Sequence, residues 1–167
     1  MSGERNEVST RQIWVDADAC PKAIKEILFR AAERLGMVLV LVANRRLRLP
    51  RSTHIKALVV PAYLDAADHA IVEGVRPGDL VVTADILLAD AVLAKGGHVL
   101  DPRGEQYTRE NIGERLAVRN FLDGLRGAGV VTSGPPPLSP TDRKIFADHL
   151  DRFLARHVKT SARPRSK

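Results

Sequence analysis

The chain contains few cysteines and aromatic residues and no long apolar run. Its 167 residues include one cysteine, Cys20, and only four Phe, two Tyr and one Trp. A single cysteine excludes an intrachain disulfide framework, and no Cys/His spacing suits a structural zinc site. No apolar run approaches the roughly 18 residues of a membrane span, and the polar residues 1–11 lack the apolar core of a signal peptide. We therefore expect a protein of the reducing cytoplasm with no membrane partner.

Most of the chain also lacks an excess of charge. There are 26 Lys and Arg against 20 Asp and Glu, a formal net charge of +6. Five of the basic residues follow residue 155, where there is no acid, so the rest of the chain is nearly neutral. They are Arg156, Lys159, Arg163, Arg165 and Lys167. Residues 158–167 are predicted to form a disordered basic tail, which either attracts phosphates non-specifically or serves only solubility.

Apolar runs alternate with helical periodicity along the remaining residues. Strands are predicted at residues 12–15, 37–43, 55–60, 80–83 and 98–100. Helices are predicted at residues 21–35, 64–73, 86–95, 109–126 and 140–157. The fourth helix should face the core with Ile112, Leu116, Leu122 and Leu125. This pattern predicts one α/β domain over residues 12–157, including a Gly/Pro-rich tether at 127–140, after a polar leader at 1–11.

Aspartates follow two of the predicted strands directly. Asp16 and Asp18 come after the first strand, and Asp85 follows the fourth. If the strands lie in the order 3-2-1-4-5, the first and fourth are neighbours, and these acids project into one crevice at the carboxyl edge of the sheet. Each acid also suits a helix cap or a turn, and Asp18 is well placed to cap the helix after Pro21. Both interpretations stay open.

A cluster of carboxylates carries an electrostatic cost that bears on its function. Two carboxylates ~5 Å apart repel by about 3 kcal/mol at an effective dielectric near 20, so an empty cluster is destabilised or partly protonated. A divalent cation removes this repulsion, and Mg²⁺ and Mn²⁺ prefer oxygen ligands. We therefore hypothesise a Mg²⁺ or Mn²⁺ site that activates water for attack on a phosphate.

Several separated segments resemble one family. They are VDADACP (15–21), NRRLRLP (44–50), YLDAADHAIV (63–72), GDLVVTADILLADAVL (78–93), LDPRGEQYT (100–108) and SGPPPLSPTDRKIF (133–146). Together they resemble the YaiI/YqxD family of uncharacterised bacterial proteins over roughly residues 12 to 155. That family is regarded as PIN-like, and PIN domains are small nucleases that hold Mg²⁺ or Mn²⁺ in an acidic cluster and cleave RNA. The resemblance implies a PIN-like three-layer α/β fold, with a mainly parallel central sheet of about five strands and helices on both faces.

The resemblance also assigns residues to the site. Asp16 and Asp85 match the acid positions after the first and fourth strands, and Asp68 matches the helical acid that PIN domains use. We expect these three to be catalytic and to bind the metal, with Asp18 and Asp90 as further ligands, although Asp90 equally suits an exposed helix position. RNA or another nucleic acid is the expected partner. The predicted nucleic-acid-binding residues are Arg45, Arg46, Arg48, Arg51 and Arg103.

Other functions fit parts of the sequence. The spacing of Asp16 and Asp18 matches a haloacid-dehalogenase-like phosphatase, in which one acid attacks phosphorus and the other protonates the leaving group. Ala19, Cys20 and the later acids depart from that pattern. A PIN-like domain can also bind RNA through its arginines without cutting it. Cys20 at a helix N-terminus suits a reactive thiol, but it lacks a partner cysteine and neighbouring carboxylates oppose the thiolate.

Overall fold

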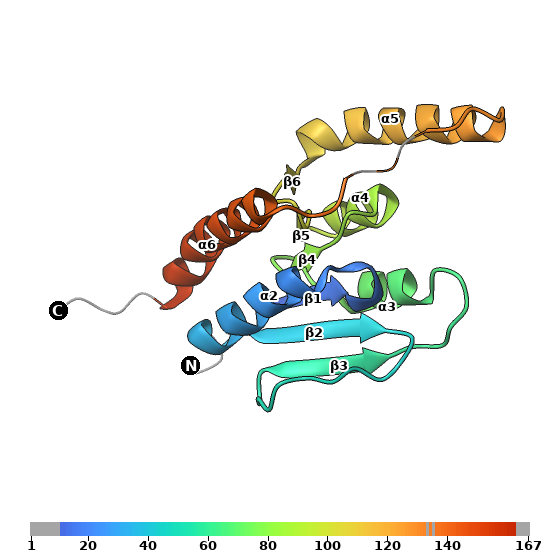
Figure 1. Cartoon of the computed structure of the whole chain (residues 1–167). Helices are drawn as coiled ribbons and strands as arrows, with labels where there is room; N and C mark the ends of the chain where they lie inside the picture. Colours follow the sequence, from blue (N-terminus) through green and yellow to red (C-terminus); the bar gives the residue numbers. More distant parts are fainter. Residues whose placement is uncertain (1–10, 133, 135, 163–167) are drawn as a thin grey trace.

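The computed structural model describes residues 11–132, 134 and 136–162, and Figure 1 shows how their elements are arranged. A six-stranded sheet in the order β3-β2-β1-β4-β5-β6 forms the centre. The first five strands are parallel, and β6 runs antiparallel to β5. The strands are β1 (Gln12–Asp16), β2 (Val38–Ala43), β3 (Ile55–Val59), β4 (Leu80–Val82), β5 (His98–Leu100) and β6 (Gln106–Tyr107). The predicted order of the first five strands is confirmed, and β6 was missed because two residues carry no periodicity.

Helices cover both faces of the sheet, as predicted, and give a three-layer α/β fold. One core, under α2 and α6, contains Ile24 and Phe146. The other, under α3, α4 and the start of α5, contains Trp14 and Ile71. Within the described residues, no helix is both long enough and apolar enough to cross a membrane. The helices are the 3-10 helix η2 (Ala17–Ala19), α2 (Lys22–Leu35), α3 (Ala66–Gly74), α4 (Ile86–Ala94), α5 (Arg109–Gly127) and α6 (Pro140–Ala162).

The strand β1 lies at the centre because it is apolar on both faces. Ile13 and Val15 pack in the core under α2 and α6, whereas Trp14 packs in the opposite core. Burial on two sides is expected of a strand inside a parallel sheet. β1 pairs with both β2 and β4, so that Val15 lies beside Leu41 and Val82. The residues that follow β1 and β4 therefore begin side by side at the carboxyl edge of the sheet.

A buried aspartate joins the strands at the opposite edge. The carboxylate of Asp79, 2% exposed, accepts hydrogen bonds from the Gln12 N–H (2.9 Å), the Arg76 N–H (3.0 Å) and the Trp14 indole N–H (3.1 Å). A buried charge is tolerated when hydrogen bonds replace its hydration. Asp79 thereby holds the start of β1 against the turn before β4, and this fixes the register that brings Asp16 toward Asp85.

Two helices differ from the prediction. α6 continues to Ala162, so residues 158–162 are helical, whereas a disordered tail was predicted there. The rest of that tail, 163–167, and residues 1–10 of the predicted leader lie outside the described residues. α5 buries only Ile112 of the four apolar residues expected to face the core, and Phe121 on the same helix is 65% exposed. Its second half projects from the body (Figure 1).

The connection between β2 and β3 contains no helix. Residues 44–54 run back beside the sheet as an irregular segment, visible below β3 in Figure 1. Leu47 and Leu49 pack against the core under α2, whereas Arg46 and Arg48, which alternate with them, are exposed. The leucines fill space that a crossover helix usually covers, and their burial turns the arginines outward.

Candidate active site

Four of the predicted aspartates, from three separate segments, line one pocket at the carboxyl edge of the sheet. Asp16 ends β1, Asp18 lies in η2, Asp68 lies in the first turn of α3, and Asp85 precedes α4. They line a pocket of about 480 Å³, together with residues of the segment that leads into α3. Parallel pairing of β1 with β4 and packing of α3 against α4 bring the acids together across about 70 residues of sequence.

Asp16 is partly buried, and its pKa responds to the acids around it. Its pKa is raised above the usual value by burial, and then by the charges of Asp18 and Asp85. Backbone hydrogen bonds from Asp18 and Ala19 oppose the rise. The short helix η2 therefore turns N–H groups toward Asp16, which partly compensates for its loss of water.

Asp68 shows the mutual repulsion of the acids most clearly. Burial and the charges of Asp85 and Asp16 raise its pKa to about 6. A hydrogen bond between the carboxyl groups of Asp68 and Asp85 also raises this pKa, because one of two acids so joined carries the proton. Asp65 contributes a further charge and lines the same pocket. It has a left-handed backbone, with φ 66°, and the sequence offered no signal for that conformation.

Asp85 has two roles that had been considered as alternatives. One oxygen, Oδ1, caps α4 by accepting hydrogen bonds from the N–H groups of Leu87 (2.9 Å) and Leu88 (3.2 Å). The backbone N–H of Asp85 donates to Oγ1 of Thr83 at 3.0 Å, and Thr83 is 4% exposed. The cap and the buried threonine hold the carboxylate in a fixed position while it still faces Asp68.

Asp18 does not cap α2, which begins after Pro21 without a side-chain cap. Its Oδ2 instead accepts a hydrogen bond from the Asn44 N–H at 2.8 Å, and its Oδ1 lies 3.6 Å from Nε of Arg45. Asp18 thus joins the end of β1 to the end of β2. It also places the first arginine of the segment 44–54 at the rim of the pocket.

Two predicted site residues lie elsewhere. Asp90 is exposed on α4 and does not line the pocket. Arg103 is engaged with the start of α6, since its Nη1 lies 2.6 Å from Oδ2 of Asp142 and its Nη2 donates to the Pro136 carbonyl. The sequence could not reveal this pairing because 39 residues separate Arg103 from Asp142. Arg46, Arg48 and Arg51 are exposed on the segment 44–54.

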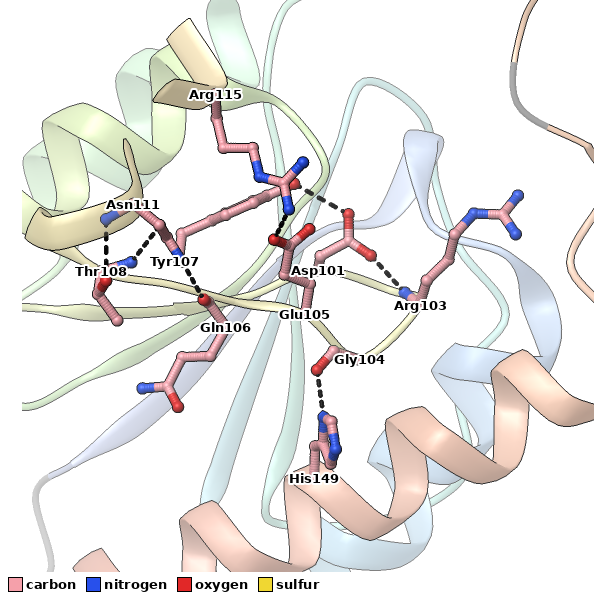
Figure 2. A network of polar contacts seen from close by, with 10 residues as sticks. All are labelled: Asp101, Arg103, Gly104, Glu105, Gln106, Tyr107, Thr108, Asn111, Arg115 and His149. Atoms are coloured by element: carbon pink, nitrogen blue, oxygen red, sulfur yellow. Dashed lines mark hydrogen bonds and ion pairs between the residues drawn. The ribbon is translucent and has the colours of Figure 1, made fainter. Parts of the chain in front are cut away.

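At the same edge of the sheet, the loop after β5 forms a polar network that was not predicted from the sequence (Figure 2). The buried Asp101 accepts hydrogen bonds from the Arg103 N–H at 2.5 Å and from the Tyr107 hydroxyl at 3.1 Å. Burial raises the pKa of Asp101 despite these bonds. His149 on α6 contacts the Gly104 carbonyl. The network attaches the loop to α6, and the Asp-Pro-Arg-Gly turn was its only sequence signal.

Cys20 is buried, and its environment is unsuited to a nucleophile. Burial raises the pKa of the thiol to about 12, and the charge of Asp16 adds to the rise. The thiol lies 3.7 Å from the Pro21 carbonyl. At neutral pH Cys20 therefore stays protonated and serves as a small packing residue in the turn into α2.

The carboxylate groups that line the pocket are the type of ligand that binds a hard divalent cation. Carboxylate oxygens are the ligands that Mg²⁺ and Mn²⁺ prefer, and raised pKa values mark Asp16 and Asp68 as lacking a positive partner. In residues 11–132, 134 and 136–162, however, no three His, Cys, Asp or Glu side chains are grouped closely enough to hold a metal ion. The acids line one pocket and influence one another's pKa values, but their oxygens are not arranged to coordinate one ion. Side-chain rotation would have to bring their oxygens together.

Comparison with known proteins places the chain among close relatives. The model of a family described as uncharacterized BCR, YaiI/YqxD family, matches residues 14–156. A UPF0178 protein of Syntrophotalea carbinolica is 58% identical over 147 residues, covering 88% of this chain and 99% of the relative. A UPF0178 protein of Aromatoleum aromaticum is 61% identical over 147 residues, covering 88% and 98%. No solved structure matches the chain.

Proposed function

This chain belongs to the YaiI/YqxD family, and we propose that it is a PIN-like nuclease that depends on Mg²⁺ or Mn²⁺ and hydrolyses RNA phosphodiesters. The observation that carries the proposal is the pocket in which Asp16, Asp18, Asp68 and Asp85 meet. The mutual repulsion of these acids works against folding, so their proximity favours a functional role.

Asp16 and Asp85 are the acids proposed to hold the metal directly, with Asp68 and Asp18 acting through water. A bound divalent cation would lower the pKa of a coordinated water and neutralise charge on a phosphate under attack. Asp85 is suited to a fixed role, because Thr83 and the cap of α4 orient it. Arg45, at the rim beside Asp18, is placed to attract the phosphate groups of a substrate.

Metal-dependent melting with matched variants tests this proposal. Asp85→Asn removes the charge yet keeps an oxygen for the cap, since Asn is as good an N-cap as Asp. Asp90→Asn makes the same change on the same helix outside the pocket. Mn²⁺ should raise the melting temperature of the wild type and of Asp90→Asn, because binding adds about 2.7 kcal/mol to the free energy of unfolding at a hundred times the dissociation constant. It should not do so for Asp85→Asn.

RNA cleavage should follow the same pattern, with activity in the wild type and Asp90→Asn, and its loss in Asp85→Asn or in EDTA. A wild type that shows neither a metal-dependent shift nor cleavage would overturn the proposal.

A non-catalytic RNA-binding module is the second candidate. It is favoured by the lack of a closely grouped ligand set among the described residues. Salt-sensitive RNA binding that survives Asp16→Asn together with Asp85→Asn, without cleavage at any metal concentration, would support it. A phosphatase is less well supported, because Asp18 is engaged by Asn44 and Arg45. Hydrolysis of a small phosphomonoester without RNA cleavage would nevertheless favour that reaction.

A further inference from the structure

A second hollow lies toward the opposite end of the arginine-bearing segment 44–54 from the acidic pocket. It has a volume of about 550 Å³ and lies between the C-terminal half of α2 and the place where residues 44–54 enter β3. Phe29, Pro50 and Ile55 supply its apolar surface, and Arg30, Arg34 and Arg51 surround them. We call this hollow the α2 groove. Its size falls in the range of small-molecule sites.

The rim of the α2 groove carries more positive than negative charge. Of the residues that the structure describes, Glu33 is the one acid that lines it and accepts a hydrogen bond from the Ser52 hydroxyl, and Arg34 is paired with Asp151 at 3.2 Å. Within the described part of the chain, the side chains of Arg30 and Arg51 have no ion pair or hydrogen bond. An apolar floor beside two unpaired guanidinium groups is complementary to a ligand with a flat apolar body and an anionic group.

The segment 44–54 connects the α2 groove to the acidic pocket. It begins at Asn44 and Arg45, on the rim of the pocket, and reaches the groove at Pro50 and Arg51. Between them lie exposed arginines, turned outward by the burial of Leu47 and Leu49. The positive charge is therefore continuous from one hollow to the other.

We propose that the α2 groove binds one nucleotide of a single-stranded RNA whose backbone follows the segment 44–54 into the acidic pocket. The base would lie against Phe29 and Pro50, and Arg30 with Arg51 would bind its phosphate. A single strand is favoured, because a base paired in a duplex enters a hollow only at the cost of unpairing and unstacking it. The identity of the strand rests on the proposed function, in which the same RNA reaches Asp16 and Asp85.

The sheet sets the length of RNA that reaches both hollows. Leu39 pairs with Ile55 at the groove end of the sheet, and five residues along β2 separate Leu39 from Asn44 at the pocket end, or about 16 Å at ~3.3 Å per residue. A stacked strand advances about 3.4 Å per nucleotide, and a strand unstacked to place a base in the groove extends up to about twice that. At least about four nucleotides are therefore needed to span this distance, and RNA of three nucleotides or fewer cannot occupy both sites.

Binding of labelled single-stranded oligoadenylates of 3 and 10 nucleotides, measured by fluorescence anisotropy in EDTA, tests the proposal without cleavage. The test variant combines Arg30→Gln and Arg51→Gln. The control combines Arg76→Gln and Arg143→Gln, which removes the same charge from exposed positions outside both hollows. Equal melting temperatures would show that all three proteins are folded.

The wild type and the control should bind the longer RNA at least tenfold more tightly than the shorter one, because the second contact is intramolecular. The test variant should lose this length dependence. It should also lose about 0.7 from the slope of log affinity against log salt, the value for one phosphate contact on a single strand. Equal affinities of the test variant and the control, or no binding of the longer RNA by the wild type at low salt, would overturn the proposal.

Failure of the nuclease proposal is separately visible. Length-dependent binding that requires Arg30 and Arg51, in a protein that never cleaves RNA with Mn²⁺, would retain the groove and reject the nuclease. The opposite result is Mn²⁺-dependent cleavage that is lost in Asp85→Asn but is unchanged for both oligomers in the arginine test variant. It would support the nuclease proposal and reject the groove as an RNA-binding site.

Discussion

At the scale of single residues, the acidic pocket works against the stability of the fold. The pKa of Asp68 is raised to about 6 by burial and by Asp85 and Asp16. A carboxyl group with a raised folded-state pKa contributes stability below its unfolded-state pKa, and this contribution is lost as the pH rises through the folded-state value. Between about pH 4 and pH 6 the contribution therefore disappears, and above that range the folded protein retains the repulsion.

Asp68→Asn should consequently raise the melting temperature in EDTA at pH 7.5, because the amide keeps a hydrogen bond to Asp85 without a charge. The gain should shrink at pH 4.5, where the wild-type carboxyl is protonated. Thermal denaturation followed by circular dichroism measures both values, with Asp90→Asn as the exposed control. A lower melting temperature for Asp68→Asn at pH 7.5 would contradict the electrostatic account of the pocket.

At the scale of elements, a helix and a loop show how structural context decides the effect of an added methyl group at a glycine. Gly124 lies in α5, where an added Cβ would meet nothing within 4 Å. Gly104 lies in the loop after β5 with φ 98°, and an added Cβ would come within 2.6 Å of Cγ2 of Ile145 on α6. The loop can approach α6 closely only because this position has no side chain.

The pair Gly104→Ala and Gly124→Ala should therefore act in opposite directions. Gly104→Ala should destabilise the protein by more than about 1 kcal/mol, because it combines a left-handed backbone with a clash. Gly124→Ala should be neutral or stabilising by up to about 1 kcal/mol, since alanine favours an exposed helix. Urea denaturation gives both free energies of unfolding. A stable Gly104→Ala protein would show that the loop is not held tightly against α6.

At the scale of the whole molecule, α6 closes the fold with a cluster of rings against the amino edge of the sheet. The ring of His98 on β5 packs edge-on against Phe153, with centroids 5.0 Å apart, and lies 4.7 Å from that of His157. Burial, and then the charge of Arg11, lower the pKa of His98. Burial and the charges of His98, Arg11 and Arg156 lower the pKa of His157. The folded protein therefore favours the neutral form of both rings.

These histidines should make the protein less stable in mild acid. The unfolded chain binds protons as the pH falls through about 6.5, whereas the folded chain resists them, so stability falls until the folded-state pKa is passed. Acids with raised pKa values, such as Asp68, act in the opposite direction, so the informative quantity is a difference between proteins. His98→Gln should lose less stability than the wild type between pH 7.5 and 5.5 by urea denaturation. If both proteins lost the same free energy of unfolding between these pH values, His98 would not be a cause of the acid sensitivity.

The alternation of apolar runs and helical spacing was enough to predict the mainly parallel sheet, and the order considered for its first five strands, 3-2-1-4-5, is the one observed. It was enough because each strand and helix carries its period in contiguous residues, and because right-handed connections leave few arrangements. The same local logic failed where contacts are distant. It could not show that Arg103 pairs with Asp142, that the second half of α5 projects from the body, or that α6 continues past residue 157.

For the candidate site, the sequence by itself determined that Asp16 and Asp85 follow strands, and strand order then placed them at one edge. Only the tertiary structure decided that Asp68 joins them and that Asp90 does not, because this depends on how α3 packs against α4. It also showed that Asp85 is both a helix cap and a pocket acid. A carboxylate has two oxygens and can serve two partners, which no pattern of residue types can display.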